Sequence, residues 1–146
     1  MPSALQSHLR RPAAAYPIRS QLGCLLKTSP SATIGGNSNC DNTGLDSPTG
    51  VTVDSSGNIY VTNAGNGPDS LGSITVYSAG SSGNVPPIAT ISDDPGCAPC
   101  DKTELSLPVG ISLDSRGNIY VANAAGWADG LGSVTEYAPL GRLAAS

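Results

Sequence analysis

An internal repeat with a period of 60 residues is the feature that most limits the folds open to this chain. The first copy begins at Leu45 and reads LDSPTGVTVDSSGNIYVTNAGNGPDSLGSITVYSAG. The second begins at Leu105, reads LSLPVGISLDSRGNIYVANAAGWADGLGSVTEYAPL, and aligns with the first without a gap. Repeats of this length are single supersecondary units that bury their apolar faces by stacking on their neighbours. The chain is therefore predicted to be an array of like units.

Each copy has the pattern of a meander of antiparallel strands. Apolar residues alternate with polar ones in segments 51–53, 59–61 and 74–76, which is typical of half-buried strands. The sequence DSSGN at 54–58 supplies the Asp and Gly of a tight turn between two strands. A fourth strand is predicted at 88–91. The pattern thus predicts one four-stranded antiparallel sheet per copy.

The two copies resemble NHL-type repeats and the related six-bladed propellers that include gluconolactonase-like enzymes. The shared pattern is Leu-x-x-Pro-x-Gly, an apolar strand, Asp-x-x-Gly-Asn-Ile-Tyr-Val and a Ser-Ile-Thr-Val-Tyr strand. The resemblance implies an all-β fold of two four-stranded antiparallel blades, which together make a partial β-propeller. NHL repeats commonly have Asp after the second strand, where this chain has Asn63 and Asn123.

The chain is predicted to divide into a leader and a repeat region. Residues 1–30 contain Arg and no acidic residue, which favours a disordered or atypical leader. Residues 31–146 are expected to hold the two blades, at about 45–104 and 105–140.

Two blades are fewer than the three or so units that stable arrays need, because the outermost apolar faces stay uncovered. We therefore expect either a fragment of a larger propeller or a chain that assembles with copies of itself. The expected partners are a second copy or the missing blades of a longer chain. The dipeptide Thr33-Ile34, which matches Thr90-Ile91 at a spacing of 57, resembles the end of a preceding blade.

The charge distribution argues against a nucleic-acid partner. All 11 acidic residues lie from Asp41 onward, where only Lys102, Arg116 and Arg142 are basic, so this region has a net charge of −8. Binding to a phosphate backbone relies on clustered Lys and Arg. No segment approaches the roughly 18 apolar residues of a membrane span. Few lysines and an even number of cysteines fit an exported protein, so we expect an extracellular or periplasmic location.

The strand order predicts where a ligand site would lie. Because consecutive antiparallel strands alternate in direction, loops 63–72, 123–132 and 92–107 leave the sheets on the same side. Loops on a rigid scaffold are the usual place for binding residues. The alternatives are structural, since Asn also braces strand ends, loop Asp is commonly solvated, and a lone Trp often covers a local apolar patch. The candidate ligand-binding residues are Asn63, Asp69, Asn123, Trp127 and Asp129.

The cysteines allow several interpretations. Cys97 and Cys100 form a C-x-x-C pair, and Cys40 lies at the position 60 residues before Cys100. A disulfide within this set fits an exported protein. A zinc site would need a second such pair, and a thioredoxin-like role would need a neighbouring helix, which the sequence does not predict. We therefore take Cys40, Cys97 and Cys100 as the disulfide candidates.

The favoured function is a non-enzymatic binding or structural repeat module, with a protein or carbohydrate ligand and no cofactor. The single histidine, His8, lies outside both repeats, so the blades contain no Ser-His-Asp or Cys-His arrangement. The alternative, implied by the resemblance, is part of a metal-dependent lactonase- or lyase-like propeller enzyme. In that case Ca²⁺ or Mg²⁺ would polarise a carbonyl, and Asn63, Asn123, Asp69 and Asp129 would be the candidate ligands or acid–base groups.

Overall fold

The computed structural model describes residues 29–36, 40–65, 72–92, 102–124 and 131–143. The chain separates into two compact units, Met1–Ser31 and Ala32–Ser146, and the repeats lie in the second unit. Across the described ranges no helix is long and apolar enough to cross a membrane. The elements of the second unit are β1 (Pro48–Val53), β2 (Ile59–Asn63), β3 (Ser73–Tyr77), β4 (Ala89–Ser92), β5 (Pro108–Leu113), β6 (Ile119–Asn123), β7 (Ser133–Tyr137) and a single helical turn, α1 (Leu140–Leu143).

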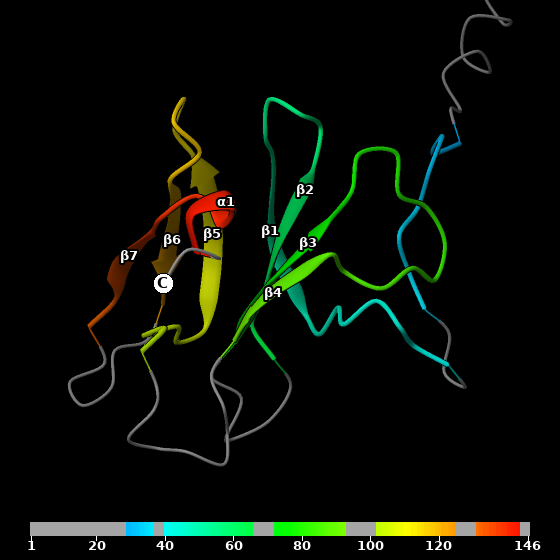
Figure 1. Cartoon of the computed structure of the whole chain (residues 1–146). Coiled ribbons are helices and arrows are strands. Elements are labelled where there is room, and N and C mark those ends of the chain that lie inside the picture. The colour runs from blue at the N-terminus through cyan, green and yellow to red at the C-terminus, as the bar shows by residue number, and fades with distance from the viewer. Residues whose placement is uncertain (1–28, 37–39, 66–71, 93–101, 125–130, 144–146) are drawn as a thin grey trace, which may run out of the picture. The chain divides into compact units, whose positions relative to one another are not determined.

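The strands form two antiparallel sheets, one for each copy of the repeat (Figure 1). The first sheet has the order β1-β2-β3-β4 and the second the order β5-β6-β7. This confirms the predicted all-β fold of antiparallel blades. Among the described residues the second blade has three strands rather than four. Adding 60 to the bounds of β4 gives 149–152, which lies past the 146 residues of the sequence.

The register of the strands is the same in both blades. Val51 is paired with Val61 and Val61 with Thr75, and the counterparts of all three pair in the same way in the second blade. The register shifts between Pro48 and Gly50, and shifts again at the corresponding place in β5. Equal register gives each blade the same two faces, because successive side chains on a strand point to opposite sides.

We call one of these faces the leading face. In the first blade it comprises Leu45, Val51, Val53, Ile59, Val61 and Tyr77, and in the second Leu105, Ile111, Leu113, Ile119, Val121 and Tyr137. We call the opposite one the trailing face. In the first blade it comprises Tyr60, Thr62, Ile74 and Val76, and in the second Tyr120, Ala122, Val134 and Glu136.

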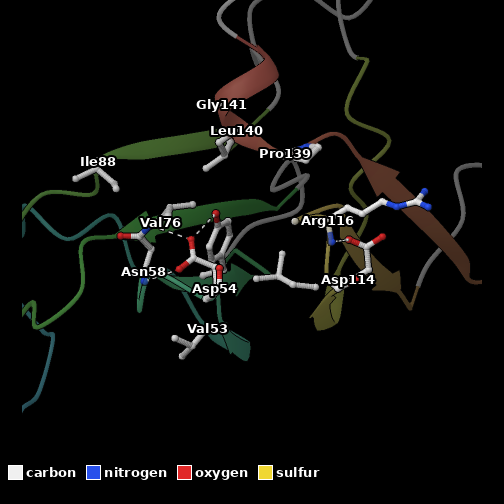
Figure 2. A pocket seen from close by; sticks show the side chains of 15 residues that line it. Val53, Asp54, Asn58, Val76, Ile88, Asp114, Arg116, Pro139, Leu140 and Gly141 are labelled. Atoms are coloured by element: carbon white, nitrogen blue, oxygen red, sulfur yellow. Dashed lines mark hydrogen bonds between the residues drawn. The ribbon is translucent and has the colours of Figure 1, made fainter.

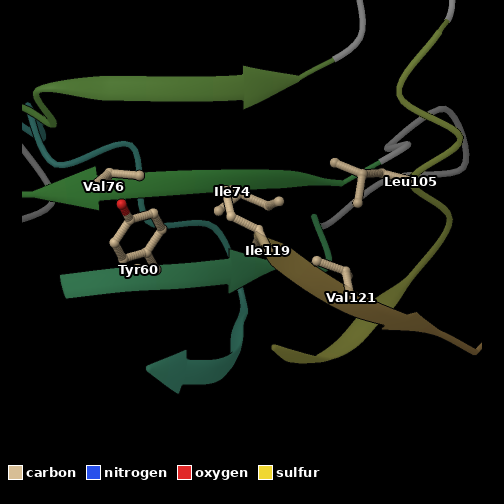
Figure 3. Packing of buried hydrophobic residues seen from close by; sticks show 6 residues of the cluster. All are labelled: Tyr60, Ile74, Val76, Leu105, Ile119 and Val121. Atoms are coloured by element: carbon tan, nitrogen blue, oxygen red, sulfur yellow. The ribbon is translucent and has the colours of Figure 1, made fainter. Parts of the chain in front are cut away.

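The core lies between the blades, where the trailing face of the first packs against the leading face of the second (Figure 3). Burying an aliphatic side chain of this size stabilises a fold by about 1.5–3 kcal/mol, so this interface is the main apolar contribution to stability. Ala89 and Ile91 of β4 add partly buried contacts. The buried cluster comprises Tyr60, Ile74, Val76, Leu105, Ile119 and Val121.

The first strands of the two blades, β1 and β5, approach closely at the edge of this core. A Cβ atom placed on Gly50 would lie 3.2 Å from the Cα atom of Gly110 and 2.9 Å from the Thr62 hydroxyl oxygen, so the approach requires glycine. Next to it, the Thr49 hydroxyl donates a hydrogen bond to the carbonyl oxygen of Pro108. The blades are therefore joined by a polar contact as well as by apolar packing.

The segments that lead into the blades are held in the same way in both copies. The Tyr77 hydroxyl donates to the carbonyl oxygen of Thr43 at 2.6 Å, and Tyr137 donates to the corresponding oxygen of Thr103. Ser47 and Leu107, which occupy equivalent positions, have φ angles of 52° and 47°. Side chains at left-handed positions are uncommon outside Gly, Asn and Asp, so this turn is imposed by its surroundings in both blades.

Candidate functional site

Asn63 and Asn123, two of the predicted ligand-binding residues, end the second strand of each blade. Their side chains are almost fully buried, with 1% and 4% of the surface exposed. The Asn63 Oδ1 atom accepts from the backbone N–H of Asp46 at 3.1 Å. Its Nδ2 group donates to the hydroxyl oxygens of Ser73 and Thr75, both at 3.2 Å.

The second blade repeats this arrangement. Asn123 Oδ1 accepts from the backbone N–H of Ser106 at 3.1 Å, and its Nδ2 group donates to Ser133 at 3.2 Å and Thr135 at 3.3 Å. Both amides thus tie the incoming segment to the second and third strands, which is the structural role considered from the sequence. A ligand at either residue would have to replace these bonds, and a ligand role for the pair stays a prediction.

The other predicted binding residues, Asp69, Trp127 and Asp129, lie outside the described residues. Within the ranges that are described, no three His, Cys, Asp or Glu side chains come close enough to hold a metal ion. The calcium or magnesium alternative is therefore a prediction that depends on the loops beyond Asn63 and Asn123.

The cysteine predictions stand in the same position. Cys97 and Cys100 fall outside the described residues, whereas Cys40 is described and exposed. The backbone oxygen of Cys40 accepts from the Asn84 side chain at 2.9 Å, which fixes the chain just before the first blade. A disulfide between Cys40 and the C-x-x-C pair stays a prediction.

On the opposite side of the first blade, the turn between β1 and β2 is organised by Asp54. Its carboxylate accepts from the backbone N–H groups of Ser56 and Asn58 and from the Asn58 side chain, each at 2.8 Å. The Tyr60 hydroxyl donates to the same carboxylate at 3.4 Å. Desolvation opposes ionisation here, but the hydrogen bonds outweigh it and lower the pKa of Asp54. Gly57 closes the turn with a φ of 84°.

The turn between β5 and β6 has the same construction around Asp114. Arg116 and Asn118 donate their backbone N–H groups at 2.8 and 2.9 Å, and the Asn118 side chain donates at 2.8 Å. Again desolvation acts against the charged form, yet the hydrogen bonds and the nearby Arg116 charge lower the pKa of Asp114. The recurring Asp and Asn of the DSxGN sequence therefore hold the turn itself.

A cavity of about 550 Å³ lies between these two turns (Figure 2). Its apolar walls come from both blades and from α1, and its polar rim carries two carboxylates and one cation. Because the carboxylates already accept the bonds that shape the turns, the cavity is suited to shape-based binding of a small, partly apolar group. The apolar residues that line it include Val53, Val76, Ile88, Leu113 and Leu140, and the charged ones are Asp54, Asp114 and Arg116.

This cavity was not predicted, since the loops expected to carry a site lie on the other side of the sheets. Its two halves are 60 residues apart and meet only because the blades stack. The available signal was the recurrence of the Asp-containing turn at the same position in each copy, which places two turns next to each other in any stacked array.

Comparison with known proteins bears on the first blade. The family model described as NHL repeat matches residues 45–67, a segment that contains β1, the Asp54 turn and β2. A search of the curated proteins gives no match. The second blade repeats the register, the turn and the strand-end amide of the matched segment. The match and the sheet architecture together show that this chain contains an NHL-type repeat built into propeller-like blades.

Proposed function

We propose that this chain is a non-enzymatic repeat module whose blades form a scaffold for a ligand site on the loops that follow β2 and β6. One observation carries the proposal: the polar residues that the two copies share are engaged in holding the blade. Asp54 shapes its turn, Asn63 braces the strand end and Tyr77 anchors the incoming segment. The same three roles recur in the second blade.

Because the shared polar residues maintain the architecture, the specificity of the module comes from positions at which the copies differ. The most distinct of these is Trp127, whose counterpart in the first copy is Gly67. An indole ring stacks on the apolar face of a sugar or anchors a protein partner. Asp69 and Asp129, in the same pair of loops, supply hydrogen-bond acceptors for such a ligand. An extracellular or periplasmic location fits a ligand of this kind.

The experiment exploits the fact that Trp127 is the single tryptophan of the chain. The protein is titrated with a panel of soluble oligosaccharides while its fluorescence emission is recorded. A saturable change is expected for at least one compound. Calorimetry then compares the wild type with Trp127→Phe, which keeps an aromatic ring, and with Trp127→Gly, which restores the residue of the first copy.

The Gly variant is expected to bind at least about tenfold more weakly, and the Phe variant to keep most of the affinity, since stacking is worth about 1.4 kcal/mol or more. Equal affinity in all three proteins would remove Trp127 from the site. Hydrolysis of a lactone that requires added Ca²⁺ or Mg²⁺ and stops with a chelator would instead support the enzymatic alternative, in which Asn63, Asn123, Asp69 and Asp129 serve the metal.

A further inference from the structure

The leading face of the first blade has the composition of an interface but lacks a covering blade. Val51 and Val53 are 66% and 56% exposed, whereas their counterparts Ile111 and Leu113 are half-buried against the first blade. Both members of each pair are aliphatic, so the first blade presents the kind of surface that the second blade buries.

The trailing face of the second blade is open in the complementary sense. Val134 is 72% exposed, although its counterpart Ile74 is fully buried in the core. Val109, next to this face, is also exposed. Each described blade thus has one covered face and one open face, and the two open faces are of opposite kinds.

The sheet edges show the same complementarity. In the first blade β4 pairs with β3, whereas β7 is the outer strand of the second sheet. The sequence Ala32-Thr33-Ile34 is identical to Ala89-Thr90-Ile91 of β4. The first blade is therefore preceded by a copy of the strand that the second sheet does not show among its described residues.

This copied strand already lies on the leading face of the first blade. Ala32 and Ile34 line an apolar hollow of about 350 Å³ together with Leu45, Val51 and Tyr77 of that face. In the same way, Ala89 and Ile91 pack against the core cluster that includes the leading face of the second blade. The segment 32–34 thus occupies the place of a fourth strand that belongs to a blade in front of the first.

We propose that a second copy of this chain docks head to tail, so that the trailing face of its second blade covers the leading face of the first blade. Ala32–Ile34 then becomes the fourth strand beside β7 of the neighbouring copy. By analogy with the β3–β4 pairing, Ile34 lies opposite Val134, Thr33 opposite Thr135 and Ala32 opposite Glu136. The inference rests on the blade architecture in the proposed function and not on any ligand.

Two differences make this contact weaker than the interface within the chain. Val109 replaces Thr49, so the hydroxyl bond that joins β1 to β5 has no equivalent between copies. Glu136 replaces Val76, a residue that lines the cavity between the blades, so its carboxylate would face a similar solvent-accessible space. There it keeps the hydrogen bond that its Oε1 atom accepts from the Tyr120 hydroxyl at 3.1 Å.

A head-to-tail contact leaves one open face at each end of a dimer, so growth continues until a ring closes. Propellers contain about four to eight blades, so a closed ring would hold about two to four of these chains. The assembly is therefore expected to be small and of defined mass, and its formation is expected to depend on protein concentration.

The test uses the full chain and two variants that block one face each. Val51→Asp places a charge on the leading face, and Val134→Asp places one on the trailing face. Both residues are exposed in the single chain, so both variants are expected to fold, which circular dichroism checks. Ser78→Asp, at an exposed position on neither face, controls for added charge. Light scattering over a range of concentrations measures the mass of each protein.

The wild type and Ser78→Asp are expected to associate, and each blocked variant alone to associate at least about tenfold more weakly, because a buried unpaired charge costs more than 1.4 kcal/mol. An equimolar mixture of the two blocked variants is expected to form a one-to-one dimer, since one keeps its trailing face and the other its leading face. This dimer cannot extend.

Three results would overturn the inference. A wild type that stays monomeric at every concentration shows that no second copy docks, and covering blades then belong to another chain or to a longer one. Self-association of Val134→Asp alone shows contact between two leading faces. Absence of a mixed dimer excludes head-to-tail docking. If Trp127 fluorescence still responds to a ligand in a monomer, the proposed function survives and only this inference fails.

Discussion

The two copies of the repeat have nearly the same apolar pattern but very different burial. Ile74 is inaccessible to solvent and Val134 mostly exposed, although they occupy equivalent positions on β3 and β7. On the other face the order reverses, because Leu105 is fully buried whereas Leu45 is half-buried. The difference is a matter of neighbours, since the described structure places a blade against one face of each copy. Stability in such an array therefore resides largely between repeats.

The polar residues behave differently, because their partners lie within the same blade. Asn63 and Asn123 make the same three hydrogen bonds, and Asp54 and Asp114 form the same turn. Substitutions at apolar positions should thus have unequal effects in the two copies, whereas substitutions at these polar positions should have equal effects.

The largest contrast is expected between Ile74→Ala and Val134→Ala. Ile74→Ala leaves a cavity in the buried cluster and is expected to lower the free energy of unfolding by about 3 kcal/mol. Val134→Ala removes an exposed side chain and is expected to change it by less than about 0.5 kcal/mol. Urea denaturation at a concentration where the chain is monomeric measures both. Equal losses would mean that Val134 is covered in the folded monomer.

A smaller and symmetrical effect is expected for Asn63→Ala and Asn123→Ala. Each substitution leaves a backbone N–H, that of Asp46 or Ser106, without its acceptor in a partly buried site. An unsatisfied donor of this kind costs about 1–3 kcal/mol, so each variant is expected to lose about 2 kcal/mol in the same urea experiment. A loss confined to one copy would contradict the equivalence of the two braces.

Thr49→Val examines the polar contact between the blades. The substitution keeps the shape of the side chain and removes the hydroxyl that donates to the carbonyl oxygen of Pro108, so a loss of about 1 kcal/mol is expected. Val109→Thr, the reverse change in the second copy, is expected to alter stability by less than about 0.5 kcal/mol. If Val109→Thr instead strengthens association between copies, the head-to-tail contact gains direct support.

The smallest effect concerns pH and the Asp54 turn. Because hydrogen bonds lower the pKa of Asp54 in the folded state, its carboxylate contributes stability above the ordinary value of 3.8. This contribution is lost as the pH falls through the lower, folded-state pKa. Wild type is therefore expected to exceed Asp54→Asn in stability at pH 7, and the difference to vanish at strongly acidic pH. Thermal unfolding followed by circular dichroism measures both proteins, and a constant difference at all pH values would contradict this assignment.

Much of the blade could be predicted because its signals are local. The alternating segments 51–53, 59–61 and 74–76 lie within β1, β2 and β3, and the fourth strand begins one residue later than predicted, at Ala89. The DSSGN turn follows from a side chain and a glycine only three residues apart. These features depend on neighbours along the chain, which a sequence displays directly.

The remaining features depend on contacts that the sequence does not display. Asn63 was considered both as a ligand residue and as a brace, and its bond to the Asp46 N–H, 17 residues earlier, describes the brace. The cavity between the Asp54 and Asp114 turns needs two stacked blades. The left-handed turn at Ser47 carries no glycine, so no residue type announces it.

The complementary leading and trailing faces have a consequence for how such genes can grow. Every 60-residue unit contains both halves of the interface, so an in-frame duplication of 60 codons inserts a blade that fits the ones before and after it. A duplication of any other length would join two halves of the same kind or shift the strand alternation. Selection can therefore vary the number of blades without first inventing a new contact, while the loops remain free to diverge.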